Sequence, residues 1–281
     1  MPLDPTKPKT ALVLEGGGMR SSYLAGVLLA FHEHNLKFDV VVGSSAGACC
    51  GAHYVTGEPE KSKIILEDHL TGNRFVKLKN IFSSGNIVDI DFFIDEICRK
   101  RVPFDITKLK NSSATLFITA TDYLTGEVTY FNNRNHDIFE ALRASCAMPY
   151  LYRKHAIYEG RRYMDGGIVE AIPVKKAIEE GCQNIIVVGT RHRGYQKRTD
   201  PLPNWLHRFS FNEAMVNIFQ KRAELYNKTI RFMNTPQKDI SITYVAPKTK
   251  LPVGRATRNK NKVIQAREIG YADGLEVCAT L

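Results

Sequence analysis

The amino-acid sequence predicts an α/β fold, with a mainly parallel sheet and helices on its faces. Two consecutive strand–turn–helix units near the start of the chain, at residues 11–31 and 39–55, carry this prediction. Buried-strand patterns at residues 114–120 and 184–189 add further strands, and helical patterns separate them. Parallel strands need crossover connections, which helices usually supply, so this alternation favours an α/β class.

The first unit joins an apolar strand, residues 11–15, to an amphipathic helix through three consecutive glycines, Gly16, Gly17 and Gly18. After the glycines, apolar residues fall at positions i, i+3, i+4 and i+7, which is the period of a helix with one buried face. These residues are Leu24, Val27, Leu28 and Phe31.

The second unit runs from a β-branched strand, residues 39–42, through Gly43-Ser44-Ser45-Ala46-Gly47 into an alanine-rich helix ending near residue 55. Gly-x-Ser-x-Gly between a strand and a helix is typical of a nucleophile elbow, because small neighbours permit the sharp turn that lifts the serine above the sheet. Ser45 fits this pattern, with Gly43 and Gly47 at the required spacing. Ser44 is expected to face inward or to cap the helix.

The remaining elements follow from shorter patterns. Residues 60–110 are mostly helical, and residues 126–131 are the expected hairpin partner of the strand at 114–120. The other expected elements are helices at 137–144, 173–180 and 211–234, a turn at 163–167 and a last strand at 240–245.

The three glycines, Gly16, Gly17 and Gly18, suggest an anion-binding loop. Backbone N–H groups of a glycine turn at a helix start can stabilise the oxyanion that forms when a serine attacks an ester. A dinucleotide-binding fingerprint would require glycine at Ser21, and a Walker A loop would require Gly-Lys-Ser/Thr, so both are excluded.

Arg20 places a cation where the helix begins, which opposes the helix dipole. Two interpretations stay open at this point. Either an anion compensates, namely a substrate phosphate or a buried carboxylate near the oxyanion site, or Arg20 is a surface arginine that points into water.

Two kinds of proton acceptor are candidates for Ser45. A histidine triad would use His192 or His207, with Asp165 as the acid. The elbow follows only one βα unit here, however, and neither histidine lies in a recognisable catalytic loop. Asp165-Gly166-Gly167 instead places a carboxylate on a tight turn beyond an apolar and aromatic approach, which favours Asp165 as the direct base.

Taken in order, these motifs resemble those of the patatin-like phospholipases, serine lipid acyl hydrolases with a Ser-Asp dyad. The resemblance covers Gly16-Gly17-Gly18-Met19-Arg20, Gly43-Ser44-Ser45-Ala46-Gly47, Asp165-Gly166-Gly167 and Ala144-Ser145-Cys146-Ala147-Met148-Pro149. It implies a three-layer α/β/α fold, Ser45 as nucleophile, Asp165 as base, an oxyanion loop at Gly16, Gly17 and Gly18, and support from Arg20. No cofactor is expected, and no metal is implied, because the acidic residues lack clustered ligand spacing.

The resemblance also implies a substrate, a phospholipid or another fatty-acyl ester that is cleaved through an acyl-enzyme. We expect one domain over residues 1–281, with a motif-bearing core at about 10–190 and a basic helical elaboration at about 191–281. Two alternative functions stay open, a His-dependent serine esterase and a non-catalytic basic binding module.

Charge and composition bear on partners and location. Residues 186–262 hold 16 Lys and Arg against 4 Asp and Glu, so the net charge of +10 resides in the C-terminal third. An amphipathic stretch from Phe209 to Phe219 could meet a membrane or pack on the sheet. The six cysteines lack metal-ligand spacing, and the polar start has no secretory signal pattern. We expect a cytoplasmic protein, with contact at the inner face of the membrane as a hypothesis and no nucleic-acid partner.

Overall fold

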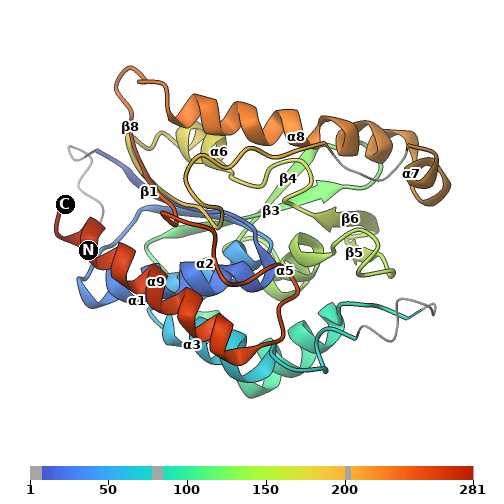
Figure 1. The fold of residues 1–281 in the computed structure, drawn as a ribbon, viewed down its shortest axis with the longest axis horizontal. Coiled ribbons are helices and arrows are strands. Elements are labelled where there is room, and N and C mark those ends of the chain that lie inside the picture. Colours follow the sequence, from blue (N-terminus) through green and yellow to red (C-terminus); the bar gives the residue numbers. More distant parts are fainter. Residues whose placement is uncertain (1–7, 78–84, 200–203, 281) are drawn as a thin grey trace.

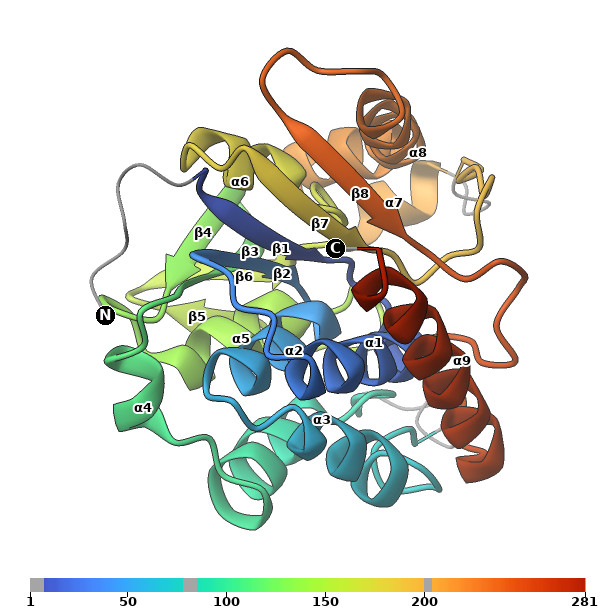
Figure 2. The same ribbon diagram turned by 90° about the vertical axis from the view of Figure 1, so that its left-hand side faces the viewer.

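A mixed sheet lies at the centre of the molecule and helices cover both of its faces (Figure 1; Figure 2). The computed structural model describes residues 8–77, 85–199 and 204–280. Within these residues the sheet has eight strands in the order β5-β6-β3-β2-β1-β7-β8, with β4 paired to β3. The expected α/β class and three-layer architecture are therefore confirmed.

Five neighbouring strands are parallel: β3 (Thr115–Asp122), β2 (Val40–Ser44), β1 (Thr10–Leu14), β7 (Asn184–Val188) and β8 (Ser241–Val245). Three antiparallel strands complete the sheet beside β3: β4 (Val128–Asn132), β6 (Arg161–Asp165) and β5 (Ala156–Tyr158). In the parallel register Leu14 pairs with both Gly43 and Val188, so β1, β2 and β7 end at the same edge.

Alternation along the strands divides the core between the two faces. On β1, Leu12 and Leu14 face one apolar cluster, whereas Ala11 and Val13 face the other. All four side chains are fully buried. The continuous apolar runs in the sequence thus reflect a sheet covered on both sides.

The larger helical layer packs on the Leu12 face (Figure 2). Its elements are η1 (Gly18–Arg20), α1 (Ser21–Glu33), α2 (Ala46–Val55), α3 (Glu60–Ile64), η2 (Ile65–His69), η4 (Phe92–Arg101), α4 (Ile106–Lys110), α5 (Ile138–Cys146) and α9 (Lys260–Cys278). The opposite face carries α6 (Val174–Glu179) and the long α8 (Glu213–Met233), preceded by α7 (Asn204–Ser210).

Close backbone contact joins α9 to α1. A Cβ atom on Gly26 would lie 2.0 Å from the Arg267 carbonyl oxygen, and one on Gly270 would lie 2.0 Å from that of Tyr23. Glycine is therefore required where the two helices cross. Because β8 also extends the sheet beside β7, the C-terminal residues continue the layers that the N-terminal residues begin.

Three details differ from the sequence predictions. The predicted turn at 163–167 is wrong at its start, because β6 continues through Asp165 and the chain turns only at Gly166 and Gly167. Helices α7 and α9 were not predicted as separate elements, and neither was strand β5. None of the helices in the described residues is long and apolar enough to cross a membrane.

Candidate active site

Ser45 occupies a tight turn between β2 and α2. Its φ of 53° and ψ of −128° are rarely adopted by a residue other than glycine. A Cβ atom on Gly43 would lie 2.5 Å from Ala48 Cα, and one on Gly47 would lie 2.6 Å from the Leu14 carbonyl oxygen. The two glycines therefore provide the space that this strained turn needs.

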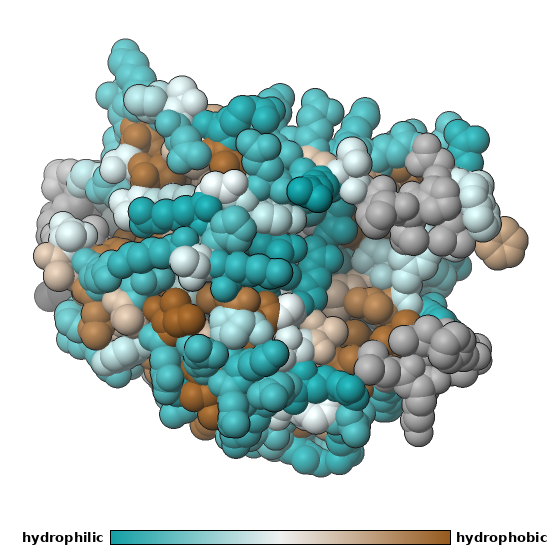
Figure 3. All heavy atoms as spheres, viewed as in Figure 1, coloured by the Kyte–Doolittle hydropathy of each residue, from teal (hydrophilic) through white to brown (hydrophobic). Residues whose placement is uncertain are grey.

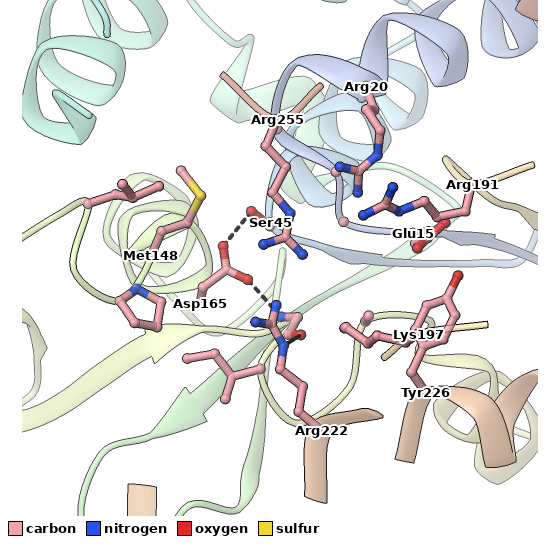
Figure 4. Close-up of a pocket in the computed structure, with 18 of the residues that line it drawn as sticks. Glu15, Arg20, Ser45, Met148, Asp165, Arg191, Lys197, Arg222, Tyr226 and Arg255 are labelled. Atoms are coloured by element: carbon pink, nitrogen blue, oxygen red, sulfur yellow. Dashed lines mark hydrogen bonds between the residues drawn. The ribbon is translucent and has the colours of Figure 1, made fainter. Parts of the chain in front are cut away.

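Asp165 ends β6 and faces Ser45 across the sheet edge (Figure 4). The Ser45 hydroxyl donates a hydrogen bond of 2.7 Å to Asp165 Oδ2, and the Gly167 N–H donates one of 2.8 Å to Oδ1. Both Ser45 and Asp165 are 6% exposed. The structure thus brings the predicted nucleophile and its predicted partner into direct contact.

Burial raises the pKa of the Asp165 carboxyl above its ordinary value. The hydrogen bonds from Ser45 and Gly167 oppose this shift, as do the charges of Arg222 and Arg255. The net shift is upward, so this carboxylate is a stronger base than an aspartate in water.

Ser145 holds the Ser45 turn and the Asp165 turn together. Its hydroxyl accepts a hydrogen bond of 2.8 Å from the Ser45 N–H, and its carbonyl accepts one of 3.2 Å from the Gly166 N–H. Next to it, the Ala147 carbonyl accepts a hydrogen bond of 3.0 Å from the Asp165 N–H. The segment noted as Ala-Ser-x-Ala-x-Pro in the sequence therefore positions both side chains.

The three glycines line the same cavity as Ser45, and Gly16 lies against the Ser45 turn. A Cβ atom on Gly16 would lie 3.2 Å from Ser45 Cβ. The Gly16 N–H donates to the Ala171 carbonyl at 3.1 Å, so it is already used. The N–H groups of Gly17 and Gly18 have no hydrogen-bond acceptor among the residues that the structure describes. Gly18 has a φ of 56°, a conformation that favours glycine.

The two candidate histidines make other contacts. His207 is buried, and its Nδ1 forms a hydrogen bond of 2.7 Å with the Tyr150 hydroxyl. His192 Nδ1 bonds the neighbouring Arg193 carbonyl at 2.9 Å. Neither ring has a hydrogen bond to Ser45 or Asp165 among the described contacts.

Arg20 is buried, with 5% of its surface exposed, and Glu15 lies on the same side of the site (Figure 4). Burial, together with the charges of Arg191 and Arg255, lowers the pKa of Arg20 to about 10, whereas the Glu15 carboxylate raises it. Arg20 therefore stays charged at neutral pH. It is not the surface arginine of the second interpretation.

Two cavities meet at Ser45. One has a volume of about 190 Å³ and a charged lining that includes Ser45, Asp165, Glu15, Arg20, Arg191, Lys197, His207, Arg222 and Arg255. The other, of about 50 Å³, is lined mainly by apolar side chains, including Ile65, Leu66, Leu70, Phe75, Val88, Ile90 and Phe93. Ser45, Gly18, Met148, Leu151 and Arg255 belong to both linings, so the serine lies at the junction.

Four cations of the charged cavity were not anticipated individually: Arg191, Lys197, Arg222 and Arg255. They come from the loop after β7, from α8 and from the loop before α9. The only signal in the sequence was the excess of basic residues between 186 and 262. In the described part of the chain, no three His, Cys, Asp or Glu side chains gather as metal ligands.

The sequence model of the patatin-like phospholipases matches residues 12–178, more than half of the chain. The chain belongs to the patatin-like phospholipase family. This membership supports lipid acyl hydrolase activity in general terms. A second model, a domain of unknown function designated DUF6363, matches residues 212–281 of this patatin-like protein.

Several known proteins are similar to this patatin-like chain. Uncharacterized protein YjjU of Escherichia coli is 28% identical over 256 residues, covering 87% of this chain and 70% of YjjU. Triacylglycerol lipase ptl3 of Schizosaccharomyces pombe is 25% identical over 62% of this chain and 43% of its own length. Lysophospholipase NTE1 of Meyerozyma guilliermondii is 27% identical over 63% of this chain, but the match spans only 12% of NTE1.

A solved structure shares the fold. VipD from Legionella pneumophila superimposes with a TM-score of 0.52 at 14% sequence identity, covering 97% of this chain and 67% of VipD. At this identity the likeness concerns the fold alone.

Proposed function

We propose that this protein is a lipid acyl hydrolase of the phospholipase A or esterase type that uses a Ser-Asp dyad. The observation that carries the proposal is the 2.7 Å hydrogen bond from the Ser45 hydroxyl to Asp165, formed where a charged cavity meets an apolar one. The substrate is a phospholipid or another fatty-acyl ester, and no cofactor takes part.

In the first step the Ser45 oxygen attacks the ester carbonyl while Asp165 Oδ2 takes the hydroxyl proton. The tetrahedral oxyanion is stabilised by the N–H groups of Gly17 and Gly18 and by the N-terminus of α2, which begins directly after Ser45. Asp165 then gives its proton to the leaving alcohol, which leaves an acyl group on Ser45.

In the second step Asp165 removes a proton from water, which attacks the acyl-enzyme. Collapse of this second intermediate releases the fatty acid, and the proton returns to Ser45. An aspartate at its ordinary pKa of about 3.9 is a weak base, so the upward shift caused by burial favours this role.

In this proposal each cavity binds a different part of the substrate. We propose that the acyl side of the ester lies toward the apolar cavity, since burying each methylene against apolar side chains contributes about 0.8 kcal/mol. The alcohol side of the ester then occupies the charged cavity. Residues 191–281 supply much of the wall of that cavity, so we propose that the core and the C-terminal elaboration act as one domain.

We also propose that α7 makes peripheral contact with membranes. Trp205 is 70% exposed and Phe209 is 89% exposed on this helix. Met215 and Phe219, also in the amphipathic stretch noted in the sequence, pack instead into a small core beside Met164. Figure 3 shows one face of the molecule that is mostly hydrophilic with separate hydrophobic patches, so a small aromatic anchor suits this surface better than a broad apolar one.

The test of the dyad is labelling with a fluorophosphonate, read by intact mass and peptide mapping, beside turnover of a soluble ester. We expect a single adduct on Ser45 in the wild type. We expect no adduct in Ser45→Ala, and labelling slowed by orders of magnitude in Asp165→Asn. Ser44→Ala is the matched control, because Ser44 is fully buried and its hydroxyl has no partner among the described residues. It should be labelled as the wild type is.

Two results would reject the proposal. Unimpaired labelling of folded Asp165→Asn would remove Asp165 as the base and favour a histidine-dependent esterase. Failure of the folded wild type to react or to cleave any ester would leave a non-catalytic binding module.

A further inference from the structure

Five basic side chains line the charged cavity beside Ser45, and we call them the cationic cluster: Arg20, Arg191, Lys197, Arg222 and Arg255. Two carboxylates share that lining, Glu15 and Asp165. Figure 4 shows the cluster side chains around the Ser45–Asp165 pair and Glu15, reaching inward from separate segments. The positive charges therefore outnumber the negative ones in the lining of the cavity that contains the proposed nucleophile.

Most of the cations in the cluster have no carboxylate of the protein close to them. Among the described residues, Arg20, Arg191, Lys197 and Arg255 have no carboxylate oxygen within 4.0 Å of their nitrogen atoms. Glu15 accepts a hydrogen bond from the Thr190 N–H. Arg20 is buried, and its Nε has no hydrogen-bond partner in the part of the chain that the structure describes. Buried guanidinium groups are normally paired, so a cavity with this lining is suited to an anionic ligand.

Hydrogen bonds fix the backbone from which two of these cations extend, and an aromatic ring contacts the guanidinium of a third. The Lys197 backbone forms two hydrogen bonds with the side chain of Asn227 on α8. The Lys197 N–H donates to Asn227 Oδ1 at 2.8 Å, and the Lys197 carbonyl accepts from Asn227 Nδ2 at 2.9 Å. The Arg191 guanidinium stacks 4.3 Å from the centre of the Tyr195 ring. The Arg255 carbonyl accepts a 3.0 Å hydrogen bond from the Met19 N–H beside the glycine loop.

Burial and repulsion by neighbouring cations make the Lys197 amine less basic. Burial, with the charges of Arg222, Arg255 and Arg191, lowers the pKa of Lys197 to about 6, although Glu15 raises it. Lys197 is therefore mostly uncharged at neutral pH in the free protein, whereas the four arginines keep their charge. An anion that contacts several members of the cluster at once favours the protonated form of Lys197 and offsets the repulsion among the arginines. Arginine forks match phosphate oxygens in pairs, which makes phosphate the best-suited anion.

We propose that the cationic cluster binds a phosphate monoester, with two negative charges, on the head group of the acyl ester. This inference rests on the proposed function, because it assumes that the acyl carbonyl lies at Ser45. With the acyl chain in the apolar cavity, the alcohol side of the ester points into the charged cavity. Its volume of about 190 Å³ suits a small polar group such as a glycerol phosphate. A quaternary ammonium head group would bring a further cation among the arginines.

The first arm of the test compares phosphatidic acid, phosphatidylglycerol and phosphatidylcholine with identical acyl chains, each at the same surface fraction in neutral detergent micelles. We expect kcat/KM to be highest for phosphatidic acid and at least about tenfold lower for phosphatidylcholine, the effect of losing one charged hydrogen-bonded contact. Equal rates, or a preference for phosphatidylcholine, would overturn the proposal.

The second arm uses variants of two cluster residues that form no hydrogen bond with Ser45 or Asp165 among the described contacts. Arg191→Gln and Lys197→Gln should each lower the ratio of phosphatidic acid to phosphatidylcholine turnover by about tenfold. Lys221→Gln is the matched control, since Lys221 is an exposed cation on α8 next to Arg222 and does not line the cavity. An unchanged ratio in both cluster variants, or an equal drop in Lys221→Gln, would refute the assignment.

The third arm uses inorganic phosphate and separates the sources of the phosphate group. Calorimetry on the catalytically inert Ser45→Ala protein should detect phosphate binding that the Arg191→Gln, Lys197→Gln combination weakens. Phosphate binding without any preference for phosphatidic acid would assign the site to a soluble phosphate compound and overturn the head-group proposal. If the wild type instead cleaves soluble esters but ignores head-group charge and phosphate, the head-group inference fails while the hydrolase function stands.

Discussion

Ser45 and Asp165 are separated by 120 residues, yet the Ser45 hydroxyl donates a 2.7 Å hydrogen bond to Asp165 Oδ2. Each side chain arrives at the end of a strand, Ser45 after β2 and Asp165 at the end of β6, and β3 lies next to both strands. Ser145 of α5 also accepts hydrogen bonds from the Ser45 N–H and the Gly166 N–H. The sheet and α5 therefore both position the pair.

The activity should depend on pH through Asp165. Its pKa is raised above 3.8 by burial, and only the ionised form accepts the Ser45 proton. We therefore expect kcat/KM to fall as the pH decreases through a value above 3.8, measured with a soluble neutral ester. A profile with no acidic limb would contradict the role of Asp165 as base.

Asp165→Asn should be more stable than the wild type at neutral pH. A carboxyl whose pKa is raised by folding favours its protonated form in the native state, so ionisation costs stability as the pH rises through the native pKa. Asparagine is neutral at every pH. The thermal midpoint should therefore be higher for the variant at neutral pH, and the difference should shrink in acid. A lower midpoint at neutral pH would show that the hydrogen bonds of the carboxylate outweigh its burial.

The candidate histidines should be dispensable for chemistry. His207 is hydrogen-bonded to Tyr150 and His192 to the Arg193 carbonyl, so neither is placed to take the Ser45 proton. We expect His192→Gln and His207→Gln to keep kcat on a soluble ester close to the wild-type value. Loss of a catalytic histidine in a triad costs about 10⁴-fold or more, so a drop of that size would restore the histidine-dependent mechanism.

Crowding between α1 and α9 should make Gly270 sensitive to a single methyl group. A Cβ atom there would lie 2.0 Å from the Tyr23 carbonyl oxygen, so the helices must separate. We expect Gly270→Ala to lower the free energy of unfolding by about 1–3 kcal/mol, in spite of the higher helix propensity of alanine. Gly254→Ala is the control, because its nearest atom is Thr257 Oγ1 at 3.8 Å.

Denaturant unfolding would measure this effect and test the single domain at the same time. In one cooperative domain, Gly270→Ala shifts the whole transition. A variant that unfolds in two separate steps, with the Ser45 region unaffected, would contradict our proposal that the C-terminal residues belong to the same domain.

Much of the sheet follows from local patterns. The runs at 11–15, 39–42, 114–120 and 184–189 correspond to β1, β2, β3 and β7, because strands buried on both faces are continuous apolar segments. The strand β6 escaped this reasoning. It begins with Arg161 and Arg162, and only its last three residues are buried, so it lacks a continuous apolar run. The two glycines after Asp165 therefore led to the prediction of a turn.

The sequence by itself determined the strand–turn–helix units, the glycines around Ser45 and the order of motifs that indicates Asp165 as its partner. The units and the glycines are local features, since a turn needs particular residues within a few positions, and the order of the motifs can be followed directly along the chain. Only the tertiary structure decided that the Gly16 N–H donates to the Ala171 carbonyl and that the candidate histidines are hydrogen-bonded to Tyr150 and to the Arg193 carbonyl. It also decided which cations share a cavity with Ser45, namely Arg191, Lys197, Arg222 and Arg255. These cations come from separate segments, and their convergence depends on how β7, α8 and the loop before α9 pack, which no local pattern encodes.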